Sequence, residues 1–243
     1  MRPGPSGGTL QRGRNLADAA GIIAHEMGHV FGLPDLYDRD ALLANGAADP
    51  EQDSAGIGSW GLMGHGATGW DDRGGPTPYC AWSLLQLGWL GRGNERLVRV
   101  EQSLPGAFFA DVNQGGNVYQ VALADSEYLL LEHRRRDGSY YERDLPAEGL
   151  LIWHVRQAVA DNDDERAKVV DLVCADGLYT DAGSPLGQAA DPDRGRDNLD
   201  FWAHDGAYRQ ARDGNLGDAG DPFDGVTRTE FTPVSNPAIN RVS

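Results

Sequence analysis

The sequence predicts an α+β fold, and the contrast between two regions carries this prediction. Residues 1–92 contain two segments with helical spacing and with residues typical of helix ends. Residues 93–243 contain short runs rich in β-branched and aromatic residues, separated by Gly, Asp, Asn and Ser. The chain has 243 residues, of which 40% are apolar, enough for one large domain or two small ones. We therefore expect a helical, site-bearing part over 1–92 and a β-rich, sandwich-like part over 93–243.

The first helix is predicted to begin near Asn15 and to end near Gly32. Asn15 is a good N-cap residue, and Asp18 resembles the second half of a capping box. Gly32, followed by Leu33 and Pro34, is a helix stop signal. The apolar residues of this helix form one stripe, which consists of Leu16, Ala19, Ile23, Met27 and Val30.

Two histidines project together from this helix, away from the apolar stripe. Each residue advances about 100° around an α-helix, so His29 follows His25 by about 40°. Two imidazoles one turn apart can bind one metal ion without straining the helix. Glu26, beside the first histidine, can receive a proton from a metal-activated water. The spacing therefore predicts a catalytic zinc site.

A catalytic zinc ion takes a third protein ligand and keeps one position for water. Gly32 lets the chain turn sharply, and Asp35 then returns six residues after His29, which completes the compact zincin pattern HExxHxxGxxD. Asp38 is the rival within the motif and could instead hold calcium. Glu51 is the nearest candidate for a glutamate ligand further along the chain, although "ADPEQDSAG" is not helical in texture. We favour Asp35.

The string "SWGLMGHG" places Met63 in a tight, Gly-rich turn downstream of Asp35. Alone, this methionine would be interpreted as a core residue. After a zinc motif, we interpret it as a methionine turn, in which a soft apolar side chain packs beneath the imidazoles.

The rest of the chain predicts one long irregular region, a second helix and several strands. Residues 39–77 show little periodicity. The second helix lies in "TPYCAWSLLQLGWL", with Thr77 as its cap, Pro78 in its first turn and Gly88 at its end. Strands are expected in "RLVRVEQ", "NVYQVAL", "EYLLLEHRR", "GLLIWHV" and "KVVDLVCAD", with a hairpin about Asp125-Ser126.

The net charge of −16 argues against binding to nucleic acid or to an anionic membrane, because both require a basic patch. Acidic side chains also offer oxygen ligands to calcium, although a solvated surface is their more ordinary role. No apolar run is long enough to span a membrane, and the first residues contain no apolar segment typical of a signal peptide. Cys80 and Cys174 could pair in an exported protein.

Several strings together resemble the immune inhibitor A family of secreted bacterial metallopeptidases. In order, they are "HEMGHVFGLPDLYD", "SWGLMG", "AWSLLQLGWL", "YLLLEHRR" with "LPAEGLLIWHV", and "DLVCADG". The resemblance implies a secreted zinc endopeptidase that acts on proteins or peptides and often binds calcium. Carried over by position, the zinc ligands are His25, His29 and Asp35, Glu26 is the base and Met63 is the turn methionine. A last string, "GDAGDPFDG", resembles a stretch near the end of that family's domain and suggests Asp218, Asp221 and Asp224 as calcium ligands.

The sequence departs from the zincin pattern ahead of the zinc helix. Zincins usually bind substrate along the edge of a sheet that precedes this helix, whereas only about 14 residues precede it here. We therefore expect the upstream sheet to be missing from this chain. The alternative function is a non-catalytic zinc-binding fragment or a β-rich interaction module. A zinc hydrolase acting on other substrates is a lesser alternative, against which the methionine turn argues.

Other polar residues receive simpler interpretations. Glu132 and His154 lie in strand-like runs and are interpreted as structural hydrogen-bonding residues. Residues 134–136, all arginines, are interpreted as a solvated strand end. An electrophilic helper for the transition state is not assigned, and Tyr79 and His65 are its weak candidates.

Overall fold

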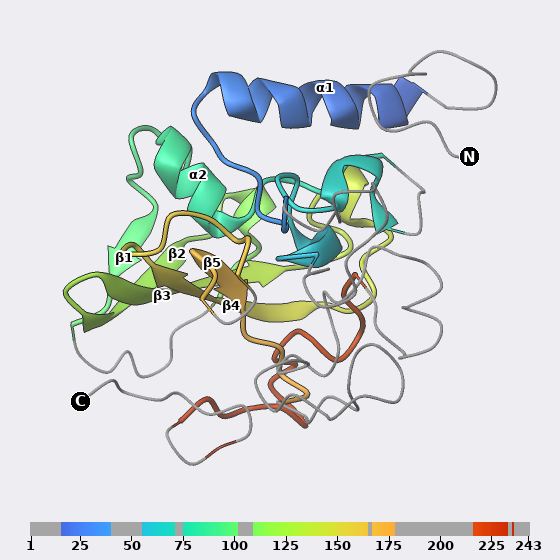
Figure 1. Ribbon diagram of the computed structural model, residues 1–243. Coiled ribbons are helices and arrows are strands. Elements are labelled where there is room, and N and C mark those ends of the chain that lie inside the picture. Colours follow the sequence, from blue (N-terminus) through green and yellow to red (C-terminus); the bar gives the residue numbers. More distant parts are fainter. Residues whose placement is uncertain are drawn as a thin grey trace, which may run out of the picture.

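The computed structural model describes residues 16–39, 55–70, 75–101, 109–164, 167–177, 216–232 and 235. These residues form two α-helices, short 3-10 turns and one five-stranded sheet, which confirms the predicted α+β class (Figure 1). The helices are α1 (Leu16–Val30) and α2 (Ala81–Leu87), and the 3-10 turns are η1 (Gly58–Trp60), η2 (Gly66–Thr68), η4 (Val112–Gln114) and η5 (Tyr140–Glu142). The strands are β1 (Leu97–Arg99), β2 (Val118–Ala124), β3 (Glu127–Arg134), β4 (Gly149–Arg156) and β5 (Val170–Leu172).

The sheet has the strand order β1-β2-β3-β4-β5. β1 runs parallel to β2, and the remaining neighbours are antiparallel. Ala124 pairs with Glu127, so the chain reverses at Asp125-Ser126, as predicted. Three strands lie within the runs that the sequence singled out, and β2 and β4 each extend one residue beyond their runs. The β-branched and aromatic residues of these runs suit a pleated, buried surface.

The two faces of the sheet bury different sets of side chains. Along β3 and β4, Leu130 and Trp153 point into the main core, whereas Leu129 and Ile152 point into a smaller cluster that includes Phe223. This alternation follows from the period of two along a strand. The sheet therefore separates Phe223 and Phe231 from the main core, whereas Leu216, earlier in the same segment, packs against the main core.

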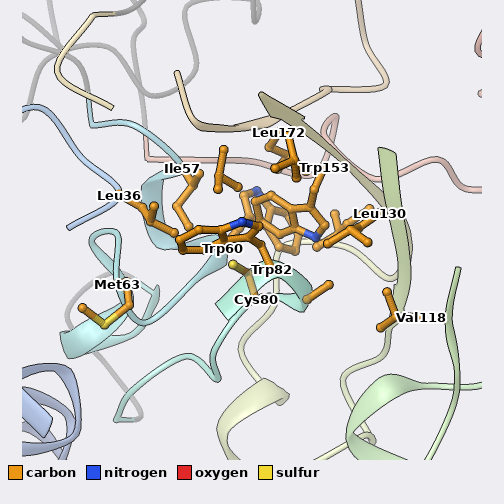
Figure 2. Packing of buried hydrophobic residues seen from close by; sticks show 14 of the residues in the cluster. Leu36, Ile57, Trp60, Met63, Cys80, Trp82, Val118, Leu130, Trp153 and Leu172 are labelled. Carbon is orange, nitrogen blue, oxygen red and sulfur yellow. The ribbon is translucent and has the colours of Figure 1, made fainter. Parts of the chain in front are cut away.

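The main core joins the residues before position 92 to the sheet. Leu36, Trp60 and Met63 belong to the same buried cluster as Trp153 and Leu172 (Figure 2). Met63 lies at one end of this cluster in the view of Figure 2. A single apolar core thus underlies both the helical and the β-rich sequence regions.

Helix α1 exposes three residues of its apolar stripe, Ile23, Met27 and Val30, whereas Ala19 is buried. Ile23 is 60% exposed and Val30 is 75% exposed, whereas His25 is only 9% exposed. A β-carbon on Gly21 would lie 1.9 Å from the carbonyl oxygen of Ala67. The glycine-bearing face of α1 therefore approaches the loop over 55–70 too closely for larger side chains, and the bulkier stripe remains on the outside.

The helix ends show where local sequence rules succeed and where they fail. Gly32, at φ +91°, follows α1, and Gly88, at φ 72°, caps α2 at its C-terminus, both as predicted. The expected start of α2 at Thr77 is wrong, since Cys80 is its N-cap. The reason is that this segment bonds to the neighbouring loop: Thr77 N–H donates to the carbonyl of Gly66, and the Pro78 carbonyl, which a helix beginning at Thr77 would use, accepts from Leu62 N–H.

The remaining expectations concern residues 134–136, the two cysteines, Asn15, Glu51 and membrane spans. Arg134 is 1% exposed, so the expectation that residues 134–136 form a solvated strand end is wrong at this position. Cys80 and Cys174 are both buried and unbonded to each other. Asn15 and Glu51 lie outside the described residues. Among the described helices, none is both long and apolar enough to cross a membrane.

Candidate metal centre

Backbone carbonyls orient the two histidines of α1. His25 Nδ1 lies 2.8 Å from the carbonyl oxygen of Leu62, and His29 Nδ1 lies 2.9 Å from that of Leu33. A carbonyl oxygen can only accept a hydrogen bond, so each Nδ1 carries the hydrogen and donates it. Both Nε2 atoms are thereby left as the metal-binding atoms, which is the usual arrangement around a ligating histidine.

The turn after α1 brings Asp35 to these two nitrogens. Asp35 Oδ1 lies 3.1 Å from His25 Nε2 and 3.3 Å from His29 Nε2. The three ligand atoms all lie within 4.8 Å of one another. Two imidazoles and one carboxylate are a donor set that suits zinc and leaves a further position for water. The residues present therefore fit the expected ion.

The charges in this group favour each other. Burial is the largest influence on the pKa of His25 and lowers it, but the hydrogen bonds to Asp35 and Leu62 and the charges of Asp35 and Glu26 together outweigh it, so the pKa is raised. Burial would raise the pKa of Asp35, but His25, His29 and Tyr37 together outweigh it, so the pKa is lowered. The pair thus favours a carboxylate facing a protonated imidazole, and a bound cation would take the place of that proton.

The residue after Asp35 anchors its loop to the predicted methionine turn. Leu36 N–H donates to the carbonyl of Met63 at 2.8 Å, and the Leu36 carbonyl accepts from Ile57 N–H at 3.0 Å. A β-carbon on Gly56 would lie 1.7 Å from the Leu36 oxygen, so glycine is needed there, also because its φ is +63°. The position of the third ligand therefore depends on the loop over 55–66.

Met63 packs directly beneath the histidine-bearing turn of α1. Its side chain is fully buried, and a β-carbon on Gly28 would lie 2.5 Å from Met63 Sδ. Because Gly28 lies between the two histidines in sequence, the absence of a side chain there lets the sulfur reach the helix. Tyr79 supports the same helix, since its hydroxyl donates to the carbonyl of Ala24 at 2.8 Å.

Tyr37 is a neighbour of this group that sequence reasoning missed. Its ring stacks on that of His25, with 6.4 Å between centroids. Its hydroxyl contributes to the lowered pKa of Asp35 through a hydrogen bond. His65, one of the candidates for the electrophilic helper, packs against Tyr37 with 5.3 Å between the ring centroids. Tyr37 stands within the quoted string "PDLYD", but nothing in its spacing marks it.

Glu26 and Asp38 are the remaining candidates for this site. Glu26 is exposed on α1 next to His25, where it can reach solvent. Asp38 is 2% exposed and is not one of the residues whose ligand atoms converge with the histidines. Asp35 is therefore the acid that the fold brings to them.

A second group of acids forms near the predicted calcium string. Asp218 and Asp221 converge with Asp176, which follows β5 and which sequence reasoning missed. Asp224 does not join them, because its exposed carboxylate accepts from the N–H groups of the turn over 226–228. Trp60 Nε1 donates to Asp221 Oδ2 at 2.5 Å, which links this group to the loop that carries Met63.

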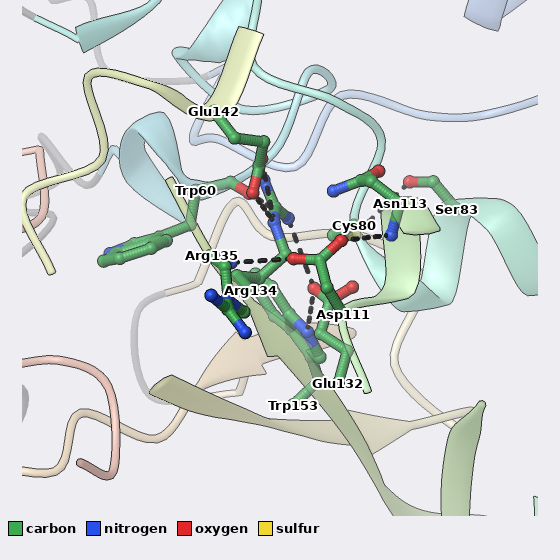
Figure 3. A network of polar contacts seen from close by, with 10 residues as sticks. All are labelled: Trp60, Cys80, Ser83, Asp111, Asn113, Glu132, Arg134, Arg135, Glu142 and Trp153. Atoms are coloured by element: carbon green, nitrogen blue, oxygen red, sulfur yellow. Dashed lines mark hydrogen bonds and ion pairs between the residues drawn. The ribbon is translucent and has the colours of Figure 1, made fainter. Parts of the chain in front are cut away.

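Buried ionic and polar contacts connect that loop to β3. Arg134 pairs with Glu142 and donates to the carbonyl of Trp60 at 3.4 Å (Figure 3). Glu132 accepts from Trp153 Nε1 at 2.8 Å, a structural role as predicted, and burial raises its pKa. His154 Nε2 lies 2.7 Å from Glu127 Oε1, again in a structural pair.

Comparisons of the chain with family models, with curated proteins and with solved structures give no match. The resemblance to the immune inhibitor A family therefore remains a prediction from the quoted strings.

Proposed function

We propose that this chain is a zinc-dependent endopeptidase module. The observation that carries the proposal is the convergence of His25 Nε2, His29 Nε2 and Asp35 Oδ1, with both Nδ1 atoms bound to backbone carbonyls. Ordinary surface histidines have no need of such an arrangement. Met63 beneath the histidine pair adds support.

Each residue has a defined part in the proposed reaction. His25, His29 and Asp35 would hold the ion. When bound, zinc would supply a Lewis acid for the scissile carbonyl and a water of lowered pKa, about 7. Glu26 would accept a proton from the attacking water and deliver it to the departing amine of the cleaved peptide bond.

The proposed architecture is the lower subdomain of a zincin. It consists of the zinc helix α1, the methionine turn around Met63 and the second helix α2, followed by the β-rich part. On the family resemblance, the substrates are proteins or peptides and the protein is secreted. Calcium is proposed as a second ion on the same basis.

Zinc content and peptide hydrolysis test this function separately. The purified chain is expected to hold one equivalent of zinc and to hydrolyse casein. Glu26→Gln should retain the zinc and lose hydrolysis, whereas His25→Ala should lose both. A wild-type chain that holds no zinc at micromolar concentration would refute the site.

The second candidate function is zinc binding without catalysis. It is favoured by the exposed Ile23, Met27 and Val30 of α1, because an apolar helix face usually packs against another part of a protein. The same assay separates the two functions. Full zinc content without casein hydrolysis, in wild type as in Glu26→Gln, would favour a binding module.

A further inference from the structure

We propose that Asn162 is a positioning residue for the third metal ligand, acting from the β-rich part of the chain. This inference rests on the proposed zinc site. In this proposal, the loop between β4 and β5 holds Asp35 in position relative to the two histidines. No sequence pattern connects this asparagine with the histidine motif.

Asn162 is fully buried, and its side chain makes three hydrogen bonds. Nδ2 donates to the Leu36 carbonyl at 3.1 Å and to the Val170 carbonyl at 2.8 Å. Oδ1 accepts from Val170 N–H at 3.1 Å. Both Nδ2 hydrogens are therefore used, and the amide links the start of β5 to the residue next to Asp35.

The Leu36 carbonyl receives two donors, Asn162 Nδ2 and Ile57 N–H. Together with the bond from Leu36 N–H to Met63, these contacts hold the two peptide groups on either side of Leu36. Since the first of these groups joins Leu36 to Asp35, a shift of Leu36 moves the Asp35 carboxylate relative to the two imidazoles. Metal affinity is sensitive to such outer contacts, typically by about 10- to 100-fold.

A second contact between the same two segments lies nearer the surface. Arg39 donates to Asp163 Oδ2 at 2.7 Å and to Asp161 Oδ2 at 3.1 Å. The Arg39 side chain is 48% exposed, so this ion pair is screened by water and contributes less. Asn162 lies between these two aspartates in the sequence and is buried. It is therefore the principal contact between this loop and the segment that follows Asp35.

The test uses Co²⁺, whose absorption spectrum reports the geometry of its ligands. Asn162→Asp preserves the shape and the acceptor for Val170 N–H, but it places an acceptor against the Leu36 carbonyl. Its Co²⁺ affinity is expected to fall by about tenfold. Its spectrum should shift toward that of Asp35→Ala. If Asn162→Asp does not fold, Asn162→Ala takes its place, because alanine adds no charge at this buried position.

The matched control is Leu130→Ala, a fully buried position of β3 in the main core. It should lower the melting temperature but leave the Co²⁺ affinity and spectrum as in wild type. Folded Asn162 variants with wild-type affinity and spectrum would overturn the positioning role. Failure of the wild-type chain to bind one equivalent of Co²⁺ would instead refute the proposed metal centre.

Discussion

The two groups of potential metal ligands differ in how their ligand atoms are held. In the histidine group, hydrogen bonds to Leu62 and Leu33 engage the Nδ1 atoms, and both Nε2 atoms face another ligand of the group, Asp35, to which His25 Nε2 is hydrogen-bonded. In the acidic group, Trp60 and backbone N–H groups engage carboxylate oxygens themselves. Asp221 Oδ2 accepts from Trp60 Nε1 and from the N–H of Asp218.

The hydrogen bonds of the first group orient the metal-binding side chains, whereas those of the second group stabilise the loop that carries the aspartates. Hydrogen bonds on the far side of a ligand fix its direction without occupying its metal-binding atom. Hydrogen bonds to the oxygens of an aspartate stabilise a loop with or without an ion. The histidine group is therefore the stronger candidate for a metal centre, and the following predictions address each side of the contrast.

The largest effect is expected from the histidine group. His29→Ala removes one of three ligands, so zinc affinity should fall by more than about 100-fold. Zinc content measured after gel filtration checks this. His154→Ala is the control, because His154 pairs with Glu127 and lies outside the group. Equal zinc loss in both variants would contradict the assignment.

If the calcium site predicted from "GDAGDPFDG" exists, calcium should stabilise the protein through the acidic group. Calcium at about 100 times its dissociation constant would raise the free energy of unfolding by about 2.7 kcal/mol. Asp176→Asn should abolish this gain, whereas Asp224→Asn should keep it, because Asp224 lies outside the group. Thermal unfolding with and without calcium measures both. No gain in wild type would make the calcium prediction wrong.

The packing of Met63 under the histidine group can be broken at Gly28. In Gly28→Ala, the new β-carbon would approach Met63 Sδ to 2.5 Å. Overpacking of this kind costs about 1–3 kcal/mol, partly offset by the better helix propensity of alanine, about 1 kcal/mol. Urea unfolding checks this. In the double variant with Met63→Ala, the effect of Gly28→Ala should become neutral or favourable.

The smallest effect concerns how stability depends on pH. The pKa of His154 is lowered, whereas that of His25 is raised. Burial, together with Arg156, lowers the pKa of His154 below its usual 6.5. The unfolded chain then binds more protons than the folded chain in the interval below 6.5. The contribution of His154 to stability is therefore complete above pH 6.5 and declines as the pH falls through the lowered pKa. In His154→Gln, urea unfolding should lose this part of the acid sensitivity, and an unchanged pH profile would contradict it.

Local signals in the sequence predicted the regular elements well. The strands and the end of α1 follow from residue type and from Gly32, because these depend on neighbours within a few residues. The start of α2 was predicted wrongly, since the Thr77 N–H is used by Gly66. The burial of Arg134 could not be predicted either, because its partner Glu142 lies beyond the strand.

The sequence by itself determined the ligand spacing of the candidate centre. His25 and His29 meet because they are one helical turn apart, and Gly32 permits the turn that returns Asp35. Only the tertiary structure decided that His25 is buried while Ile23, Met27 and Val30 of the apolar stripe are exposed. It also brought Asn162 to the carbonyl of Leu36. The physical reason is range: helix spacing is a property of adjacent peptide units, whereas burial and hydrogen-bond partners depend on segments that only the folded chain brings together.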